Sequence, residues 1–394
     1  MKQLPTDAYD LIVVGAGPAG TTTARLAAEA GCRVLVIDKR QELGAPIQCS
    51  GAVSRHALEE VGIAPDGEFI QEPIYGFQIY DEAGASVTID YRELKGDEYG
   101  EGPGRRPLGY VVDRRRFDRH LLTLALRAGV ETSLKTEGTG YSCDPDGLAT
   151  VSVVRYGQPE RLRCRCVVGA DGLMSQVGKW AGLRTHIRQG ELAACLQYVC
   201  DGVESHGLLE IVTGHAWAPG GYAWVFPKGH GYTEIGLGVT PNNTRLSAKQ
   251  HLRHFMESSF LAERFGGARV LEVQGGGVPL AAPLTTQFAD RMILVGDAAR
   301  HVNPITGGGI HTALSGGRVA ARVLAQAVRR GETFTPAVTE RYQDAWLEAL
   351  GDKMWKLYRE KSSIFREADL SLRNRRLFAT MSGYFSPDSE YKKI

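Results

Sequence analysis

The chain lacks any hydrophobic run of the length that a membrane span needs, which is about 18 consecutive apolar residues. Its most apolar helix-like stretch near the carboxyl end, 310–328, is interrupted by Arg318 and Arg322. A short polar lead runs from Met1 directly into a predicted strand, so no signal peptide is expected. These absences predict a cytoplasmic protein with no membrane-spanning helix.

An excess of charge of either sign is also missing. Lys and Arg together number 46 against 45 Asp and Glu, a net charge of +1, and we therefore expect no nucleic-acid partner. The seven cysteines are an odd number without a CxxC pair, and Cys164 and Cys166 stand too close together for a usual zinc pair. The sequence thus predicts no metal site and a reducing compartment.

Glycine, by contrast, is abundant at 48 residues, and two glycine-rich segments stand far apart in the chain. The first follows an apolar run, 11–14, that is typical of a buried parallel strand. A predicted helix over 18–30 and a second strand over 34–37 complete a βαβ unit of about 30 residues, which is the size that a nucleotide-binding unit requires.

Three glycines in the first turn of this unit have the GxGxxG spacing. Gly15 allows the tight turn, Gly17 lets the backbone approach a pyrophosphate, and Gly20 permits close packing of helix on strand. Asp38 ends the second strand, where its carboxylate would bind the adenosine ribose hydroxyls and repel the 2′-phosphate of NADP. A lone GxGxxG is weak evidence, but the strand, helix and acid together predict a dinucleotide site.

The second glycine-rich segment lies near the end of the chain. An apolar strand over 293–295 leads to Gly296 and Asp297, a carboxylate suited to the ribityl hydroxyls of FAD, although a turn or capping Asp is the alternative. The run 307–309 precedes a predicted helix and would bring backbone N–H groups to the flavin N1–C2=O edge, which becomes anionic on reduction. A glycine-rich loop without a ligand is the alternative there. Together the two segments predict FAD.

Between these segments the pattern changes to short β-like runs with Gly and Pro turns. Residues 193–239, rich in aromatics, indicate an antiparallel sheet in a second domain. Ser247 and Gln250 have capping-box spacing at the start of a predicted helix. Further predicted elements are a hairpin within 70–91 that turns at 82–85, a helix over 115–128, strands within 151–168, an apolar helix side made of Leu252, Phe255, Met256 and Phe260, and helices from about 335 onward.

The predicted fold class is α/β with α+β parts, in three regions. A Rossmann-like FAD-binding domain is discontinuous and takes up 1–75, 100–180 and 280–332. A substrate-binding domain with an antiparallel sheet is inserted into it and comprises 76–99 and 181–279. A helical region, 333–394, follows.

Four segments carry a resemblance to a known family. They are 44–49 (GAPIQC), 110–118 (YVVDRRRFD), 219–227 (PGGYAWVFP) and 296–310. With them the chain resembles the geranylgeranyl reductase family of archaeal lipid synthesis, within the FAD proteins typified by para-hydroxybenzoate hydroxylase. The specific segment is 219–227, which fits the family's PxxYxWxFP substrate-cavity motif at every fixed position, whereas hydroxylases and halogenases share the FAD segments.

The resemblance implies a set of FAD contacts in this chain. They fall on Ala19, Asp38, Cys49, Ser50, Ala52, Arg114, Gly138, Asp297, Gly309 and Ile310. The chain departs from the family at Gly51, where members often have Glu, and at Gln48, which often corresponds to Arg. The missing acid at Gly51 argues against a carboxylate beside the flavin.

Two residues are predicted to be catalytic, Cys49 and Tyr222. Cys49 is expected to pack against the flavin, donate a proton or exchange electrons with it, and the alternative is a small buried hydrophobic residue. Tyr222, Trp224 and Phe226 alternate along a strand and share one face. On pattern alone this is an ordinary aromatic core, but the family motif makes it the wall that binds an isoprenoid chain.

The function that follows is reduction of geranylgeranyl C=C bonds by hydride from N5 of reduced FAD, with the lipid a phospholipid, a diphosphate or a quinone side chain. An FAD monooxygenase or halogenase, a flavin dehydrogenase acting on quinone, and a non-catalytic FAD or lipid carrier are the alternatives. Electrons would come from an external ferredoxin, deazaflavin or NAD(P)H. The segment 345–361 contains Trp346, Leu350, Trp355 and Tyr358 with Lys353, Lys356, Arg359 and Lys361 beside them. Peripheral contact with an anionic membrane is therefore expected; a packed helix with a solvated basic face is the alternative.

Overall fold

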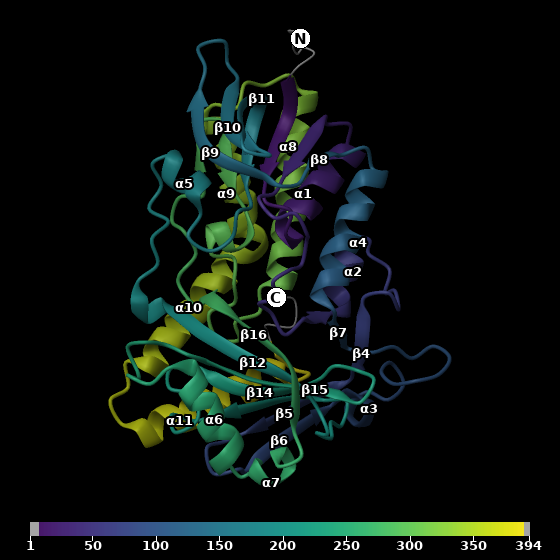
Figure 1. Cartoon of the computed structure of the whole chain (residues 1–394), viewed down its shortest axis with the longest axis vertical. Helices are drawn as coiled ribbons and strands as arrows, with labels where there is room; N and C mark the ends of the chain where they lie inside the picture. The colour runs from purple at the N-terminus through teal and green to yellow at the C-terminus, as the bar shows by residue number, and fades with distance from the viewer. Residues whose placement is uncertain (1–7, 390–394) are drawn as a thin grey trace.

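The computed structural model describes residues 8–389, which form two large sheets and a small one. Figure 1 shows the two large sheets in separate halves of the molecule, with α1 and α8 against the upper sheet. The eight-stranded sheet has the order β17-β18-β11-β1-β2-β8, extended by β10 and β9 beyond β11. Its strands are β1 (Ala8–Val14), β2 (Val34–Ile37), β8 (Glu131–Ser133), β9 (Thr136–Cys143), β10 (Ala149–Arg155), β11 (Gln158–Gly169), β17 (Phe288–Ala289) and β18 (Met292–Leu294).

The seven-stranded sheet has the order β16-β12-β15-β14-β13-β5-β6, and the small sheet the order β3-β7-β4. The strands of the larger one are β5 (Gly76–Tyr80), β6 (Ser86–Asp90), β12 (Leu192–Asp201), β13 (Leu209–Thr213), β14 (Tyr222–Pro227), β15 (Tyr232–Val239) and β16 (Arg269–Pro279). Those of the smaller one are β3 (Ala52–Ser54), β4 (Ile70–Ile74) and β7 (Gly109–Val112).

Helices cover both large sheets. The α-helices are α1 (Pro18–Glu29), α2 (Arg55–Glu60), α3 (Tyr91–Leu94), α4 (Arg114–Arg127), α5 (Gln176–Trp180), α6 (Ala248–Ser258), α7 (Ala262–Phe265), α8 (Ile310–Arg329), α9 (Pro336–Trp346), α10 (Asp352–Phe365) and α11 (Leu370–Phe385). Two 3-10 turns, η1 (Gln189–Glu191) and η2 (Gly296–Ala299), and a π-helical turn, η3 (Leu347–Gly351), join them. Within residues 8–389, no helix has both the length and the apolar composition for a membrane crossing.

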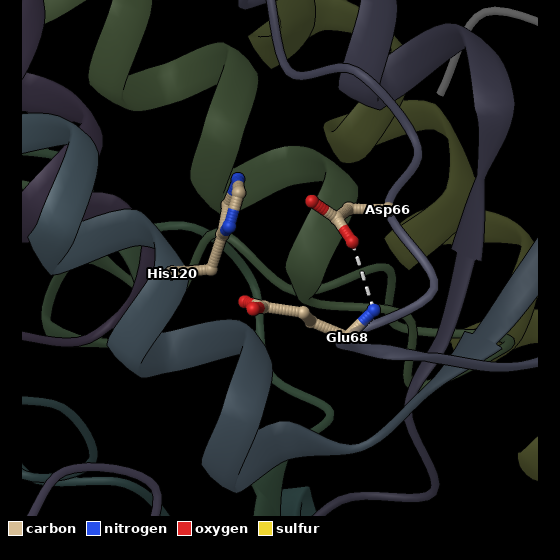
Figure 2. Close-up of side chains that lie close together, drawn as sticks. All are labelled: Asp66, Glu68 and His120. Carbon is tan, nitrogen blue, oxygen red and sulfur yellow. Dashed lines mark hydrogen bonds between the residues drawn. The ribbon is translucent and has the colours of Figure 1, made fainter.

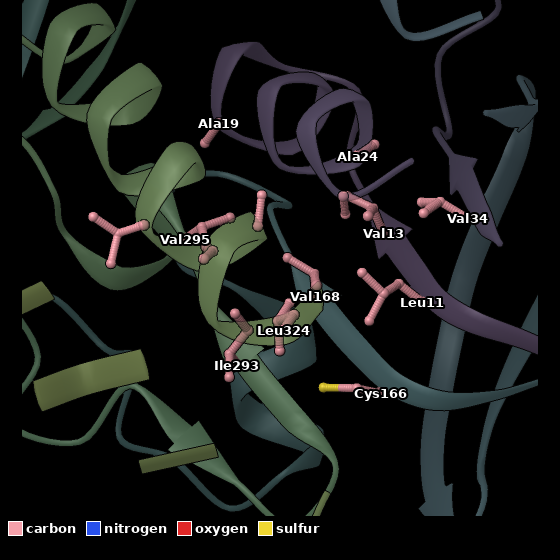
Figure 3. Packing of buried hydrophobic residues seen from close by; sticks show 14 of the residues in the cluster. Leu11, Val13, Ala19, Ala24, Val34, Cys166, Val168, Ile293, Val295 and Leu324 are labelled. Atoms are coloured by element: carbon pink, nitrogen blue, oxygen red, sulfur yellow. The ribbon is translucent and has the colours of Figure 1, made fainter. Parts of the chain in front are cut away.

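The chain returns to its first sheet near its end. Strand β18 pairs in parallel with β11, which in turn pairs in parallel with β1. Figure 3 shows the core that this return completes: Leu11 and Val13 of β1 pack with Val168 of β11 and Ile293 of β18. Apolar burial on these strands therefore places the second glycine-rich segment beside the first, and the predicted α/β class is confirmed.

The second large sheet differs in two respects from the predicted antiparallel one. Strand β13 pairs in parallel with β5, Leu209 opposite Phe77, so the sheet is mixed. The predicted hairpin is the pair β5–β6, whereas β4 joins the small sheet. The Ser247–Gln250 capping box is present at α6, but Phe260 lies beyond that helix and is 38% exposed against Tyr80.

The helices after residue 335 pack into the protein. Trp346 is fully buried and stacks on His301 with ring centroids 4.1 Å apart, and Leu350 and Lys361 are buried as well. These three residues of 345–361 therefore face protein, whereas Trp355 and Tyr358 are half-buried and Lys356 and Arg359 are exposed. Membrane contact of this segment stays a prediction.

Candidate functional site

The turn after β1 leaves space where a pyrophosphate would lie. Gly15 has φ +110°, and a Cβ there would be 2.2 Å from the Ala170 carbonyl oxygen, while a Cβ on Gly20 would be 2.0 Å from the Gly15 oxygen. A Cβ on Gly17, in contrast, would have no protein atom within 4 Å. Helix α1 begins here without a side-chain cap, so its first N–H groups are available to an anion.

The Asp38 carboxylate lies beside this turn and accepts a hydrogen bond of 2.8 Å from the Ala16 N–H. Arg40 donates to both carboxylate oxygens, at 2.9 and 2.7 Å. Burial raises the pKa of Asp38, but these hydrogen bonds and the Arg40 charge outweigh it, so its pKa is below the usual range. The sequence analysis did not identify Arg40. Its positive charge lies on the Asp38 carboxylate and offsets the repulsion that Asp38 alone would exert on a phosphate.

The second glycine-rich segment meets the first directly. A Cβ on Gly296 would lie 2.7 Å from the Cβ of Ala19, so the two segments touch. Burial raises the pKa of Asp297, with Arg114 opposing, and no group within residues 8–389 donates a hydrogen bond to this carboxylate. Gly309, before Ile310 and the uncapped start of α8, lies beside Asp297, because a Cβ there would be 3.6 Å from Oδ1.

Arg114 anchors the loop that carries Cys49. It donates to Asp118 at 3.0 and 3.1 Å within the first turns of α4. Burial alone would lower the pKa of Arg114, but Asp118 and the neighbouring Cys49 sulfur raise it overall. The Cys49 sulfur also accepts a hydrogen bond from the Gly51 N–H at 3.4 Å, so in this structure it acts as an acceptor.

Gly51 has a structural reason to be glycine. Its φ is +86°, and a Cβ would be 2.2 Å from the Val112 carbonyl oxygen. A Glu at this position therefore does not fit this backbone, which accounts for the departure from the family pattern. Gly138 of β9 lies on the other side of the cradle, where a Cβ would be 3.5 Å from Val14.

An apolar cavity of about 320 Å³ opens between these loops and the seven-stranded sheet. Tyr222, Trp224 and Phe226 of β14 all line it, as their alternation predicts. So do residues of the FAD loops, namely Cys49, Ser50, Ala52, Gly309 and Ile310. Gly236 on β15 makes room for the indole, because a Cβ there would be 2.5 Å from the Trp224 ring.

Tyr222 joins the cavity wall to the loop before α8. Its hydroxyl donates a hydrogen bond to the Thr306 carbonyl oxygen. Burial raises the pKa of the Tyr222 phenol well above its usual value. The proton of Tyr222 is therefore held by the loop and is not directed into the cavity.

Sequence reasoning missed three buried groups near the cavity. Lys228 and Glu234 form an ion pair, and Lys228 also donates to the Ser50 carbonyl oxygen at 2.9 Å. Lys361, assigned to a membrane face, in fact lines the cavity. The position of Lys228 directly after the 219–227 motif was the one sequence feature that could have identified it. Nothing in the local sequence pattern predicts a buried Glu234 or Lys361.

Asp66, Glu68 and His120 lie close together outside this site. Figure 2 shows them on the loop before β4 and on α4, and their potential ligand atoms all lie within 4.8 Å of one another. Both carboxylates are exposed, and Asp66 already accepts a hydrogen bond from the Glu68 N–H at 2.9 Å. None of the three lines the cavity, and we assign them no role in it.

The cradle fits FAD on three counts. The open space at Gly17 and the uncapped start of α1 suit the pyrophosphate. Asp38 suits the adenosine ribose, and the half-buried Asp297 carboxylate has no donor among residues 8–389, so ribityl hydroxyls could supply one. The start of α8 offers N–H groups to an anionic ring edge.

Comparison with known proteins agrees with this geometry. Residues 8–205 match the model of an FAD binding domain, and residues 191–278 match the geranylgeranyl reductase catalytic domain. FAD is therefore the cofactor.

Curated relatives cover most of the chain. A digeranylgeranylglycerophospholipid reductase of Methanosarcina acetivorans is 35% identical over 346 residues, 88% of this chain and 82% of the relative. Digeranylgeranylglycerophospholipid reductase 2 of Methanopyrus kandleri is 37% identical over 362 residues, 91% of this chain and 87% of the relative.

Solved structures show the same fold. A geranylgeranyl bacteriochlorophyll reductase-like protein from Thermoplasma acidophilum has a TM-score of 0.85 and 29% identity, over 98% of this chain and 93% of that one. The p-nitrophenol 4-monooxygenase of Pseudomonas putida has a TM-score of 0.72 at 20% identity, over 98% and 96%. The second likeness concerns the fold alone.

Proposed function

The chain belongs to the digeranylgeranylglycerophospholipid reductase family, and we propose that it hydrogenates isoprenoid C=C bonds in the geranylgeranyl chains of archaeal-type membrane lipid precursors. The observation that carries the proposal is the apolar cavity between the Cys49 loop and the aromatic face of β14. Burial of each CH₂ contributes about 0.8 kcal/mol. Such a cavity therefore binds a long hydrocarbon chain without polar contacts along its length.

Bound FAD in its reduced form supplies a hydride for one carbon of the C=C bond. The other carbon needs a proton at the same time, because an isolated alkene has no carbonyl group to take up negative charge. The cavity walls formed by β14 and α11, which include Trp224 and Phe385, would keep water from the reacting carbons.

We assign Cys49 and Tyr222 to the reacting end of the cavity. Cys49 contacts the reacting atoms from the loop that Arg114 anchors. Tyr222 fixes the loop 306–309 through the Thr306 carbonyl. The Tyr222 phenol donates its proton to the loop and not to the cavity.

The test is anaerobic incubation of the dithionite-reduced holoenzyme with digeranylgeranylglyceryl phospholipid, followed by mass spectrometry. We expect the lipid to gain hydrogen pairs while the flavin returns to its oxidised spectrum. An unchanged lipid with FAD still bound would overturn the proposal. Aerobic release of hydrogen peroxide with NAD(P)H, and no lipid reduction, would indicate a monooxygenase.

The electron donor and the membrane contact belong to the same proposal. Reduced ferredoxin, reduced deazaflavin and NAD(P)H are compared as donors by the rate of flavin bleaching.

For the membrane we infer that the first turn of α11 makes the contact, because Leu370 and Leu372 are 45% and 36% exposed and Arg375 lies nearby on the helix. The double variant Leu370→Ser, Leu372→Ser is expected to lose co-sedimentation with anionic vesicles; unchanged co-sedimentation would refute this placement.

A further inference from the structure

Lys361 is a buried cation in the wall of the apolar cavity. It comes from the last turns of α10, where Ile364 and Phe365 line the same wall, and is only 7% exposed. Its Nζ donates one hydrogen bond, of 2.5 Å, to the Leu280 carbonyl oxygen. Within residues 8–389 it forms no ion pair with a carboxylate.

An unpaired buried ammonium is costly to the fold. Lysine is almost never fully buried without a partner, because taking one charge out of water is unfavourable even after the protein relaxes around it. An ammonium has three N–H donors, and the Leu280 carbonyl accepts from one of them. A charged donor facing an apolar cavity, with capacity left for a ligand, is typical of a functional site.

The ammonium lies at the FAD-loop end of the cavity. Leu280, whose carbonyl it contacts, borders the loop before α8: a Cβ on Gly307 would be 3.8 Å from Leu280 Cδ2. The same Cβ would be 4.0 Å from the Tyr222 hydroxyl. Lys361 is therefore held by a residue that borders the same loop as Tyr222, which is the loop that leads into the start of α8.

We propose that Lys361 is the acid that protonates the alkene in the reaction proposed above, on which this role rests. One Nζ–H bond breaks and one C–H bond forms, while the hydride provides the electron pair of the second new C–H bond. The alkene is thereby reduced and the flavin oxidised. Lysine is left as a neutral amine and regains a proton from solvent before the next turnover.

The electrostatic surroundings agree with this role. Burial lowers the pKa of Lys361 to about 8, with Glu191 of η1 opposing, and an acid works best when its pKa lies near the working pH. Tyr358, one turn earlier on α10, donates to Glu191 at 2.5 Å. On the other elements that line the cavity, burial lowers the pKa of His311 to about 4 and raises that of Tyr222 and of Cys195, the latter to about 12.

The test compares Lys361→Ala with Lys356→Ala, which removes an exposed lysine from the same helix. Turnover of the phospholipid by the Lys361→Ala holoenzyme is expected to fall about 100-fold or more, with KM changed little, while Lys356→Ala behaves as wild type. Small primary amines added to the assay should restore turnover in Lys361→Ala only, faster for more acidic amines. If Lys361→Ala does not retain FAD, Lys361→Met, which keeps the aliphatic stem, replaces it.

A second readout does not depend on turnover. In the wild-type holoenzyme, the lysine NMR signal that disappears in Lys361→Met should titrate near pH 8, and turnover should fall as the pH rises through that value, because the acid form is lost. Titration at the ordinary lysine value of about 10.4, undiminished turnover in Lys361→Ala, or a raised KM at full kcat would each overturn the proposal. Wild-type protein that reduces no lipid would instead refute the proposed function, and this role with it.

Discussion

Lys228 Nζ and Glu234 Oε2 lie 3.2 Å apart in the interior of the seven-stranded sheet, with side chains 6% and 0% exposed. Glu234 also accepts a hydrogen bond of 3.0 Å from Trp224 Nε1, and Lys228 donates to the Ser50 carbonyl oxygen. The pair therefore connects an aromatic side chain of the cavity wall to the loop that carries Cys49.

Replacing Lys228 with Met is predicted to lower the free energy of unfolding by about 3–5 kcal/mol, because Glu234 is left as an uncompensated buried charge. It also frees the Ser50 loop, so the affinity for FAD should fall. Urea unfolding and FAD fluorescence measure the two effects. Arg264→Met is the control: it breaks the pair between Arg264 of α7 and Glu210 of β13 in the same sheet, and should destabilise the protein with FAD affinity unchanged. If Lys228→Met bound FAD as tightly as Arg264→Met, the contact between Lys228 and the Ser50 loop would have no effect on FAD binding.

Gly17→Ala and Gly15→Ala are predicted to fail in different ways. The methyl group on Gly17 meets no protein atom but enters the pyrophosphate space, so the apoprotein keeps its Tm while FAD binds at least about tenfold more weakly. The methyl group on Gly15 collides with the Ala170 carbonyl and lowers the Tm of the apoprotein itself. Thermal scans with and without FAD distinguish the two, and an unchanged FAD affinity in Gly17→Ala would disprove the position of the pyrophosphate.

Arg40→Gln is predicted to shift the acid limit of FAD binding to higher pH. In the wild type the pKa of Asp38 is lowered, so its contribution to stability is present above the ordinary pKa and is lost as the pH falls through the lowered one. Without Arg40 the pKa of Asp38 rises, and the loss begins at a less acidic pH. FAD release followed by fluorescence during acid titration measures the shift; coincident curves would show that Arg40 has no such effect.

Cys49→Ala is predicted to retain FAD but lose most of its lipid turnover, because the cradle is built by other residues while the sulfur faces the cavity. Cys195→Ala is the control, since it removes a second thiol that lines the same cavity from β12. Full turnover in Cys49→Ala, measured by the hydrogen pairs gained, would remove Cys49 from the mechanism.

Ile211→Trp is predicted to reduce turnover of long chains at nearly unchanged Tm, because Ile211 lines the cavity and the indole can occupy it. Its neighbour Val212 faces the opposite side of β13, in a core with Phe255. Val212→Trp should overpack that core and cost about 1–3 kcal/mol of stability. Turnover of the full-length lipid at the wild-type rate in Ile211→Trp would argue against this wall as the chain-binding one.

The elements with a local signal were predictable from the sequence. Gly15, Gly17 and Asp38 are fixed by a turn whose chemistry lies within one βαβ unit, and β14 carries its alternation in six residues. The parallel pairing of β13 with β5 could not be predicted from the sequence, since it depends on a contact between distant segments. Lys361 was misplaced because a basic residue on an amphipathic helix reads as solvated, and only the tertiary packing of α10 shows that it is buried.

The contact between Gly296 and Ala19 has a consequence for FAD binding during synthesis of the protein on the ribosome. Half of the cradle is made within the first forty or so residues, but Asp297 and the start of α8 are synthesised only near the end. A nascent or truncated chain that ends before Gly309 therefore has a turn for the pyrophosphate and no support for the flavin ring. Tight FAD binding thus distinguishes finished polypeptides from unfinished ones, and the cofactor stabilises the chain only once both ends of the domain have met.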